Sequence, residues 1–461
     1  MRSAFRSDDR RSGVRGRAGA AAAIAAMLAL AACTSSPSSD AGETAPAAPV
    51  EEVASSPVLV ATTEGGDVAL DGSSGALLAG GPGTVATSDA STMYRARVLG
   101  GRTVVTTLDP RTGVTMGSSS LRGELELAVA SVSGEALALV QPAPGAPSGS
   151  LLGLPMPRSW TPIVVADPGG GTSPARFRLE GNYEPEAFSI DDERLFLIEY
   201  LPAEAPAVYR VTVLDLETGE VRPVTGRFKS PPERMPGVRL GQVYDPATSQ
   251  MYTLYSNQPG AYAAAYEHAG GSSREWPQET FVHVLNLRKG WAYCAGVPKA
   301  MWGGTAREQA LVPSADGRML YIVDSGEDMV AVMDTRSLEV VRTASVELDA
   351  TGDAETDSET GRTSLAVTTD GATLFIASGS SPGTVSAIDT EALTLADRWA
   401  SPLPASGLGL SLDGSALYIA GGGRIALVDT ATGEARATVP TAVLEPIVGV
   451  HPLAGAADAS P

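Results

Sequence analysis

The sequence has very few of the residues that build metal centres and disulfide frameworks. Its 461 residues include two cysteines and three histidines, which excludes a disulfide-rich scaffold, a cysteine-rich zinc module and an iron–sulfur site. Basic residues are also in deficit, because 33 Lys and Arg stand against 53 Asp and Glu, for a formal net charge of −20. A surface that binds nucleic acid or anionic lipid needs Lys and Arg to neutralise the phosphate charges, so we expect this protein to bind neither.

The first segment of the chain has the layout of an export signal. Six arginines precede an apolar run from Ala18 to Ala32, which is shorter than the roughly 20 residues that span a bilayer. The run ends in Leu30-Ala31-Ala32-Cys33, which resembles the lipobox of bacterial lipoproteins. The resemblance implies lipid attachment to Cys33 and anchoring of the exported protein at the outer face of the cell membrane. The alternative is an uncleaved alanine-rich anchor with a chance cysteine.

Composition divides the chain into four segments. Residues 1–32 are the expected signal peptide, and residues 33–56, rich in Ser, Pro and Ala without apolar periodicity, are the expected flexible tether. Residues 57–453 carry the folded domain, and residues 454–461 are the expected disordered tail. The hydrophobic content of 43% is enough for a packed core.

The folded part is built from one repeated unit. Residues 314–335, 369–390 and 412–430 share a pattern. In each, an Asp-Gly pair supplies a turn between two apolar segments, and a third alternating segment ends at Asp-Thr. The segments run 5–8 residues between turn-forming residues, which favours strands over helices. A repeat of about 40–50 residues with four antiparallel strands is typical of a propeller blade.

These repeats resemble the YVTN/WD-type β-propeller families over residues 57–453. The resemblance implies an all-β fold, a single β-propeller of four-stranded blades. A polar residue that closes each third strand occurs eight times, which predicts eight blades, with seven as the alternative. The markers are Asp71, Asp109, Asp167, Asp215, Asn286, Asp334, Asp389 and Asp429. The first unit shows three strands, and residues 445–451 supply a lone strand, so we expect the two chain ends to pair and close the ring.

Four long connections interrupt the repeats, at residues 143–159, 227–238, 257–279 and 348–362. With this strand assignment, all four join second to third strands or fourth to first strands. They should therefore emerge on one face, and loops on a rigid scaffold commonly carry function.

The fifth unit is enriched in aromatic residues. Tyr and Trp combine a broad apolar ring with a polar group, which suits binding surfaces. We therefore predict that loops at 257–279 and 295–306 present rings to a ligand or partner. The candidates are Tyr262, Tyr266, Trp276 and Trp302. The alternative is that the rings pack an irregular blade, and this is the interpretation we prefer for Trp291 and Tyr293 on a strand.

The remaining reactive groups do not form a recognisable site. Cys294 can come near His283 across paired strands, and the turn at 288–290 should place Trp291 or its neighbour opposite Leu287. A buried, inert cysteine is the interpretation that we prefer over a nucleophile. The acidic stretch 349–359 lacks the spacing of a calcium loop and is expected to be solvated. We predict no metal, no cofactor and no catalytic residues.

The sequence thus predicts a monomeric, surface-anchored binding module for a protein, glycan or small molecule, which touches the membrane only through its lipid. The alternative is a propeller enzyme of the lactonase or lyase kind, with its site at the central channel. A structural role in the cell envelope is the third hypothesis. The fold alone does not specify a ligand.

Overall fold

The residues that the computed structural model describes all belong to one compact unit, Ser55–Pro461. They are residues 57–63, 65–143, 155–228, 234–258, 279–303, 307–348, 362–378, 383–443 and 447–453. The predicted signal peptide, tether and tail lie outside these residues.

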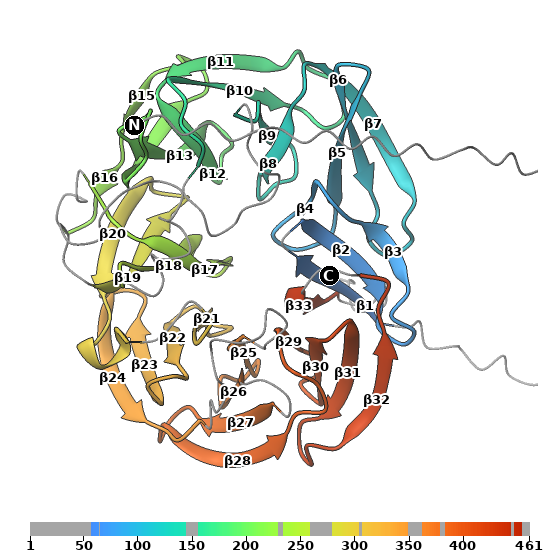
Figure 1. Ribbon diagram of the computed structural model, residues 1–461, viewed down its shortest axis with the longest axis vertical. Helices are drawn as coiled ribbons and strands as arrows, with labels where there is room; N and C mark the ends of the chain where they lie inside the picture. Colours follow the sequence, from blue (N-terminus) through green and yellow to red (C-terminus); the bar gives the residue numbers. More distant parts are fainter. Residues whose placement is uncertain are drawn as a thin grey trace, which may run out of the picture. The chain divides into compact units, whose positions relative to one another are not determined.

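The described residues form eight antiparallel sheets arranged as blades around a ring (Figure 1). Blade 1 contains β33 (Ile447–Pro452), β1 (Val58–Thr63), β2 (Gly66–Asp71) and β3 (Leu77–Gly80). Blade 2 contains β4 (Thr84–Ala86), β5 (Met93–Leu99), β6 (Arg102–Leu108) and β7 (Thr115–Arg122). Blade 3 contains β8 (Glu126–Ala130), β9 (Leu137–Val140), β10 (Trp160–Ala166) and β11 (Ala175–Glu180). Blade 4 contains β12 (Asn182–Phe188), β13 (Arg194–Leu201), β14 (Val208–Asp215) and β15 (Val221–Pro223).

The other four blades follow the same strand order. Blade 5 contains β17 (Val238–Asp245), β18 (Gln250–Ser256), β19 (Thr280–Asn286) and β20 (Trp291–Gly296), and β16 (Thr225–Gly226) pairs with β20 in parallel. Blade 6 contains β21 (Gln309–Pro313), β22 (Met319–Asp324), β23 (Met329–Asp334) and β24 (Glu339–Ser345). Blade 7 contains β25 (Ser364–Val367), β26 (Thr373–Ser378), β27 (Thr384–Asp389) and β28 (Thr394–Ala400). Blade 8 contains β29 (Gly407–Leu410), β30 (Ala416–Gly421), β31 (Arg424–Asp429) and β32 (Ala435–Pro440).

The fold is therefore an eight-bladed β-propeller, as the eight sequence markers predict. All eight markers end a third strand or follow its last residue. The one short helix among the described residues is the 3₁₀ turn η2 (Lys299–Met301). Nowhere in the described residues is there a helix of the length and apolarity that a bilayer span requires.

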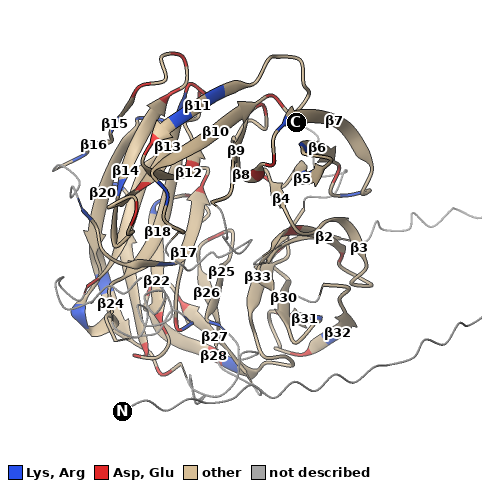
Figure 2. Ribbon diagram, turned by 45° about the horizontal axis from the view of Figure 1, so that its top comes forward, with Lys and Arg blue, Asp and Glu red and all other residues tan. Residues whose placement is uncertain are grey.

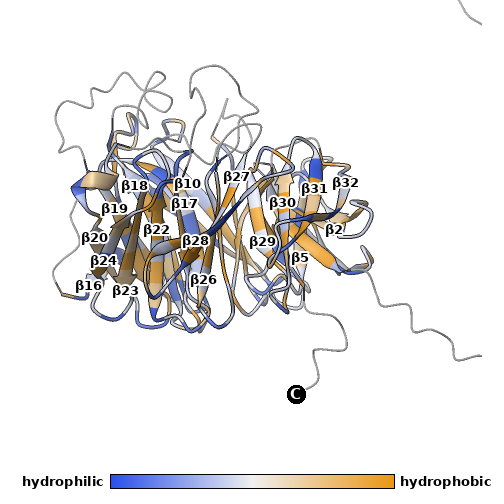
Figure 3. Cartoon of the chain, turned by 90° about the horizontal axis from the view of Figure 1, so that it is seen from below, coloured by the Kyte–Doolittle hydropathy of each residue, from blue (hydrophilic) through white to orange (hydrophobic). Residues whose placement is uncertain are grey.

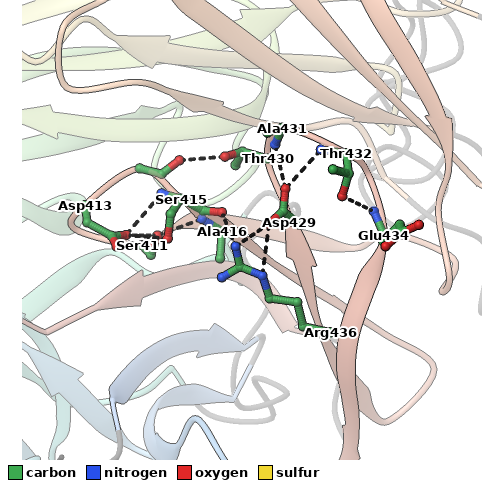
Figure 4. A network of polar contacts seen from close by, with 11 residues as sticks. Ser411, Asp413, Ser415, Ala416, Asp429, Thr430, Ala431, Thr432, Glu434 and Arg436 are labelled. Carbon is green, nitrogen blue, oxygen red and sulfur yellow. Dashed lines mark hydrogen bonds and ion pairs between the residues drawn. The ribbon is translucent and has the colours of Figure 1, made fainter.

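The marker residues close each third strand by a local hydrogen-bonding mechanism. In blade 8, one carboxylate oxygen of Asp429 accepts hydrogen bonds from the backbone N–H groups of Ala431 and Thr432, each at 2.9 Å (Figure 4). An Asx side chain that captures the following N–H groups replaces the next ladder bonds and starts a turn. The neighbouring Thr430 hydroxyl donates to the carbonyl of Gly414, 2.9 Å away in the first hairpin turn. The two turns therefore lie on one face of the blade, which we call the turn face.

The ring closes by pairing the two ends of the described chain, as predicted. Strand β33 pairs antiparallel with β1, with Val450 opposite Ala61, and Figure 1 shows the two side by side. Blade 8 packs closely on this seam, because a Cβ on Gly409 would lie 2.4 Å from the carbonyl oxygen of Val450. Because β33 supplies the first strand of blade 1, β1 has a hydrogen-bonded partner on both sides, and the edge of β1 is not left open.

The hydrophobic core lies between neighbouring blades. Between blades 5 and 6, for example, Val282 and Val284 of β19 pack with Leu320 and Ile322 of β22 in one buried cluster. Viewed from the side, apolar residues follow the strands, and polar residues gather at the turns (Figure 3).

The four long connections begin and end at the face opposite the turn face, as predicted. They join β9 to β10, β16 to β17, β18 to β19, and β24 to β25. We call this side the loop face.

Candidate functional site

Charged side chains from neighbouring inner strands meet at the loop-face end of blades 4 and 5. Arg239 of β17 lies 3.0 Å from a carboxylate oxygen of Glu184 and 3.7 Å from one of Glu186, both on β12. The Glu186 side chain is 3% exposed, whereas those of Glu184 and Arg239 are 40% and 19% exposed. One carboxylate is thus buried behind the arginine, and the other remains open to solvent.

Two further side chains fix the carboxylates in place. The Tyr200 hydroxyl donates to Glu184 at 2.7 Å, and the Gln242 amide donates to Glu186 at 2.5 Å. Burial raises the pKa of Glu186, and the charge of Arg239 opposes this shift. Burial alone would lower the pKa of Arg239, but Glu186 and Glu184 together raise it well above its usual value. The arginine is therefore permanently charged.

A second arginine reaches the strand of Arg239 from blade 7. Arg362, which precedes the first strand of blade 7, donates from its guanidinium group to the carbonyl of Leu240 in blade 5, at 3.3 Å. The contact passes over blade 6 and brings the guanidinium to the inner strands. We call Glu184, Glu186, Arg239 and Arg362 the inner-rim cluster. It combines two carboxylates and two guanidinium groups in a protein with a formal net charge of −20, and Figure 2 marks the acidic and basic residues along the ribbon.

An aromatic stack lies behind the inner-rim cluster. Tyr255 stacks on Tyr209 with ring centroids 4.8 Å apart, and on Phe281 at 5.6 Å. Burial is the largest cause that raises the pKa of Tyr255, and the nearby carboxylate of Glu186 adds to it. The stacked rings give the charged groups a rigid apolar backing.

The only described thiol lies beyond the stack, toward the outer strand of blade 5. Cys294 on β20 is directly opposite His283 on β19, and its sulfur lies 3.5 Å from His283 Nδ1. The thiol also donates to the Met235 thioether sulfur at 3.3 Å. Trp291 opposes Asn286 at the end of the ladder, so its neighbour Gly290 lies across the turn from Leu287, within the predicted alternatives.

A separate cleft of about 710 Å³ lies between blades 2 and 3. Arg102, Arg122 and Arg176 line it, together with Ser119 and Asp167. The carboxylate of Asp167 is occupied by turn N–H groups, and the buried Ser119 hydroxyl has no hydrogen-bond partner among the described residues. We call this the arginine cleft. Its size and guanidinium groups suit an anionic ligand.

Most of the predicted binding residues lie outside the described residues. These are Tyr262, Tyr266, Trp276 and the lipid-attachment residue Cys33. The acidic stretch 349–359 also falls outside. Among the described residues, no group of three or more His, Cys, Asp and Glu side chains is placed to hold a metal ion.

Trp302 is the one predicted binding residue that the structure describes. Its indole N–H donates to the carbonyl of Val297 at 3.1 Å, and Lys299 lies over its ring. The ring packs against the core between blades 5 and 6, as do Trp291 and Tyr293. These contacts confirm packing for the two strand residues. They also give Trp302 a packing role, and its part in ligand capture stays a prediction.

Sequence reasoning missed the inner-rim cluster. A usable signal is present, because the first strands of blades 6 to 8 read Gln-Ala-Leu-Val, Ser-Leu-Ala-Val and Gly-Leu-Gly-Leu, whereas β12 carries Glu184 and Glu186. Charges on an inner strand depart from the pattern of the repeat. Arg362 had no such signal, since its contact joins residues 122 positions apart.

The comparisons with known proteins agree on the fold. No protein-family model matches the sequence, and no curated protein matches it either. AztD of Citrobacter koseri matches in structure with a TM-score of 0.50 and 10% identity, over 87% of this chain and 98% of that one. The dihydro-heme d1 dehydrogenase NirN, solved in complex with DHE, gives a TM-score of 0.48 and 14% identity over 89% and 78% of the two chains. Sqt1 of Saccharomyces cerevisiae gives 0.47 and 10% over 82% and 87%. At 10% identity the match to AztD shows the propeller fold and nothing finer.

Proposed function

We propose that this propeller is a binding module that captures a polar small molecule or glycan at the inner-rim cluster. The observation that carries the proposal is the solvent-open carboxylate of Glu184, held in one orientation by Arg239 and Tyr200. A charged group that is fixed before the ligand arrives loses little conformational entropy on binding. The guanidinium group of Arg362 lies against the carbonyl of Leu240, the residue next to Arg239. Groups of both charges suit a ligand with both donors and acceptors, such as a sugar or a zwitterion.

Binding is favoured over catalysis by the accessibility of the acids. An acid–base enzyme needs two groups that both reach the substrate. Glu186 is almost completely buried behind Arg239, so only Glu184 is open to a ligand. The lactonase-like or lyase-like alternative would require a second accessible acid or base beside Glu184.

The location of the module follows from the sequence alone. We propose that Cys33 carries the lipid and that residues 34–56 tether the propeller at the outer face of the membrane. Metabolic labelling with a palmitate analogue tests this: the full chain should incorporate the label, and Cys33→Ala should not. Equal labelling of the two proteins would contradict it.

The binding proposal is tested by thermal unfolding with a panel of ligands. The panel contains neutral sugars, amino acids, dicarboxylates and sugar phosphates. A ligand at about 100 times its Kd adds about 2.7 kcal/mol. For a folded unit of this size, with an unfolding entropy of about 2.1 cal/mol/K per residue, this raises Tm by about 3 °C.

Two variants give the panel its control. Arg362→Ala should abolish the shift, whereas Arg336→Ala, an exposed arginine in a turn-face loop of blade 6, should keep it. A shift that survives in Arg362→Ala contradicts the inner-rim site. A shift with anionic ligands alone that is lost in Arg176→Ala would move the site to the arginine cleft.

A further inference from the structure

Two donor side chains approach the Cys294 thiol between blades 4 and 5, apart from the inner-rim cluster. The sulfur of Cys294 lies 3.3 Å from the sulfur of Met235 and 3.5 Å from Nδ1 of His283. These side chains come from three segments, namely β20, the connection before β17, and β19. Their convergence is a product of the tertiary fold, since Met235 and Cys294 are 59 positions apart.

The backbone holds each of the three donors in place. Cys294 and His283 form a directly opposed pair in the β19–β20 ladder. Met235 is fixed by two backbone hydrogen bonds with Tyr209, at 2.7 and 2.9 Å. Met235 and His283 are buried, and Cys294 is half-buried. The cluster is therefore preorganised, and the thiol gives it a route to solvent.

We propose that Cys294, His283 and Met235 form a binding site for one Cu(I) ion. Thiolate and thioether sulfur select soft cations such as Cu(I), and imidazole also binds copper. Donors bound at about 2.0–2.3 Å in a trigonal arrangement lie about 3.5–4 Å apart. In that geometry two sulfurs lie about 4.0 Å apart, and a sulfur and a nitrogen about 3.7 Å apart. The two separations from the Cys294 sulfur, 3.3 Å to Met235 and 3.5 Å to His283, are shorter, so the Met235 and His283 side chains would move outward to admit the ion.

The same donors fit other roles less well. Structural zinc takes four ligands, almost always Cys, His or carboxylate, and no further such group joins the pair in the described residues. A nucleophilic cysteine needs its base to accept a proton. His283 is buried, and burial disfavours the charged ring of an imidazolium–thiolate pair. The thiol also donates a hydrogen bond to the sulfur of Met235 and not to His283.

Binding exchanges one proton for one ion. The Cys294 thiol loses its proton to solvent, and a copper–sulfur bond forms with the resulting thiolate. His283 binds as the neutral imidazole through Nδ1, with its proton on Nε2. That atom has no hydrogen-bond partner among the described residues, so no acceptor competes for the ring. No change of oxidation state is involved, because the ion arrives as Cu(I).

The test is a competition titration of the full chain with Cu(I) held by bathocuproine disulfonate, under anaerobic conditions. Every protein carries Cys33→Ser, so that Cys294 is its only thiol. We expect one equivalent of Cu(I) to transfer to this parent protein. Cys294→Ser should lose the transfer, and Met235→Leu should weaken affinity by about 10-fold or more. The matched control is Met251→Leu, because Met251 is buried in the same hydrophobic cluster as Met235 and should leave the affinity unchanged.

Two further measurements keep the result decisive. Thermal unfolding of each metal-free variant shows whether it is folded, so that a lost site is not confused with a lost fold. X-ray absorption of the copper-loaded parent should show two sulfur donors and one nitrogen donor. Stoichiometric transfer to Cys294→Ser, equal affinities for the two Met→Leu variants, or a copper shell without sulfur would each overturn the proposal.

Discussion

Asp324 in blade 6 should make the protein less stable as the pH rises through the weakly acidic range. The residue is fully buried at the loop-face end of β22. Burial is the largest cause that raises its pKa, from 3.8 to about 6, and the charges of Glu308 and Glu327 add to the shift. The Gln309 amide and the Glu327 backbone N–H donate to the carboxylate and oppose it, at 2.7 and 3.2 Å.

The sign and size of the effect follow from proton linkage. The folded state binds the proton more tightly than the unfolded state, so stability is fully present below pH 4 and is lost as the pH rises through 6. One pKa unit corresponds to about 1.4 kcal/mol. A shift of about two units therefore removes about 3 kcal/mol from the free energy of unfolding by pH 7.5.

The assay compares the wild type with Asp324→Asn, which cannot ionise. Guanidinium titrations between pH 4 and pH 7.5, followed by tryptophan fluorescence, give the free energy of unfolding of each protein. The free energy of unfolding of the wild type, relative to that of Asp324→Asn, should fall by about 3 kcal/mol as the pH rises across this range. The prediction concerns how this difference changes with pH. A hydrogen bond lost in Asp324→Asn would shift the difference by the same amount at every pH and would not affect the test.

The matched control is Asp316→Asn in the turn of the same blade. Hydrogen bonds, first from the Ser314 hydroxyl, lower the pKa of Asp316, so its difference from wild type should stay flat above pH 5. A flat difference for Asp324→Asn as well would refute the reasoning.

Three other changes test the fold. Gly409→Ala places its Cβ against the Val450 carbonyl at the closing seam and should lower the free energy of unfolding by about 1–3 kcal/mol, measured by thermal unfolding. Gly241→Ala, with open space around it, should leave the free energy of unfolding unchanged in the same measurement. Asp334→Ala removes the acceptor of two turn N–H groups and should cost about 1 kcal/mol, whereas Asp334→Asn keeps an acceptor and should cost little. Trp302→Ala should lower Tm, because the ring packs on the core and its N–H is hydrogen-bonded; an unchanged Tm would contradict this packing role.

The architecture could be predicted because the turns that define each blade depend on residues close to one another in the sequence. An Asx residue that captures the next N–H groups needs neighbours two or three positions away, so its effect is visible in the repeat itself. Closure was also predictable, because the first unit lacks one strand and the last segment supplies one. The type of propeller within the YVTN/WD resemblance stays a prediction.

The site was harder to predict because its contacts are distant in sequence. Arg239 meets Glu184 across two blades, and Arg362 meets Leu240 across three. Composition pointed to the aromatic residues of blade 5, which the core also requires. The pairing of Cys294 with His283 was open to prediction from strand order. The approach of Met235 was not, because it depends on how the connection before β17 folds.

The central claim is that the inner-rim cluster binds a polar ligand, and a capture experiment tests it most directly. The wild type, Glu184→Gln, Arg362→Ala and Arg336→Ala are each incubated with a small-molecule extract and separated from it by filtration, and the retained compounds are identified by mass spectrometry. The account predicts one class of polar compound retained by the wild type and Arg336→Ala, and lost from the two inner-rim variants. Equal retention by all four proteins, or none by the wild type, would contradict it.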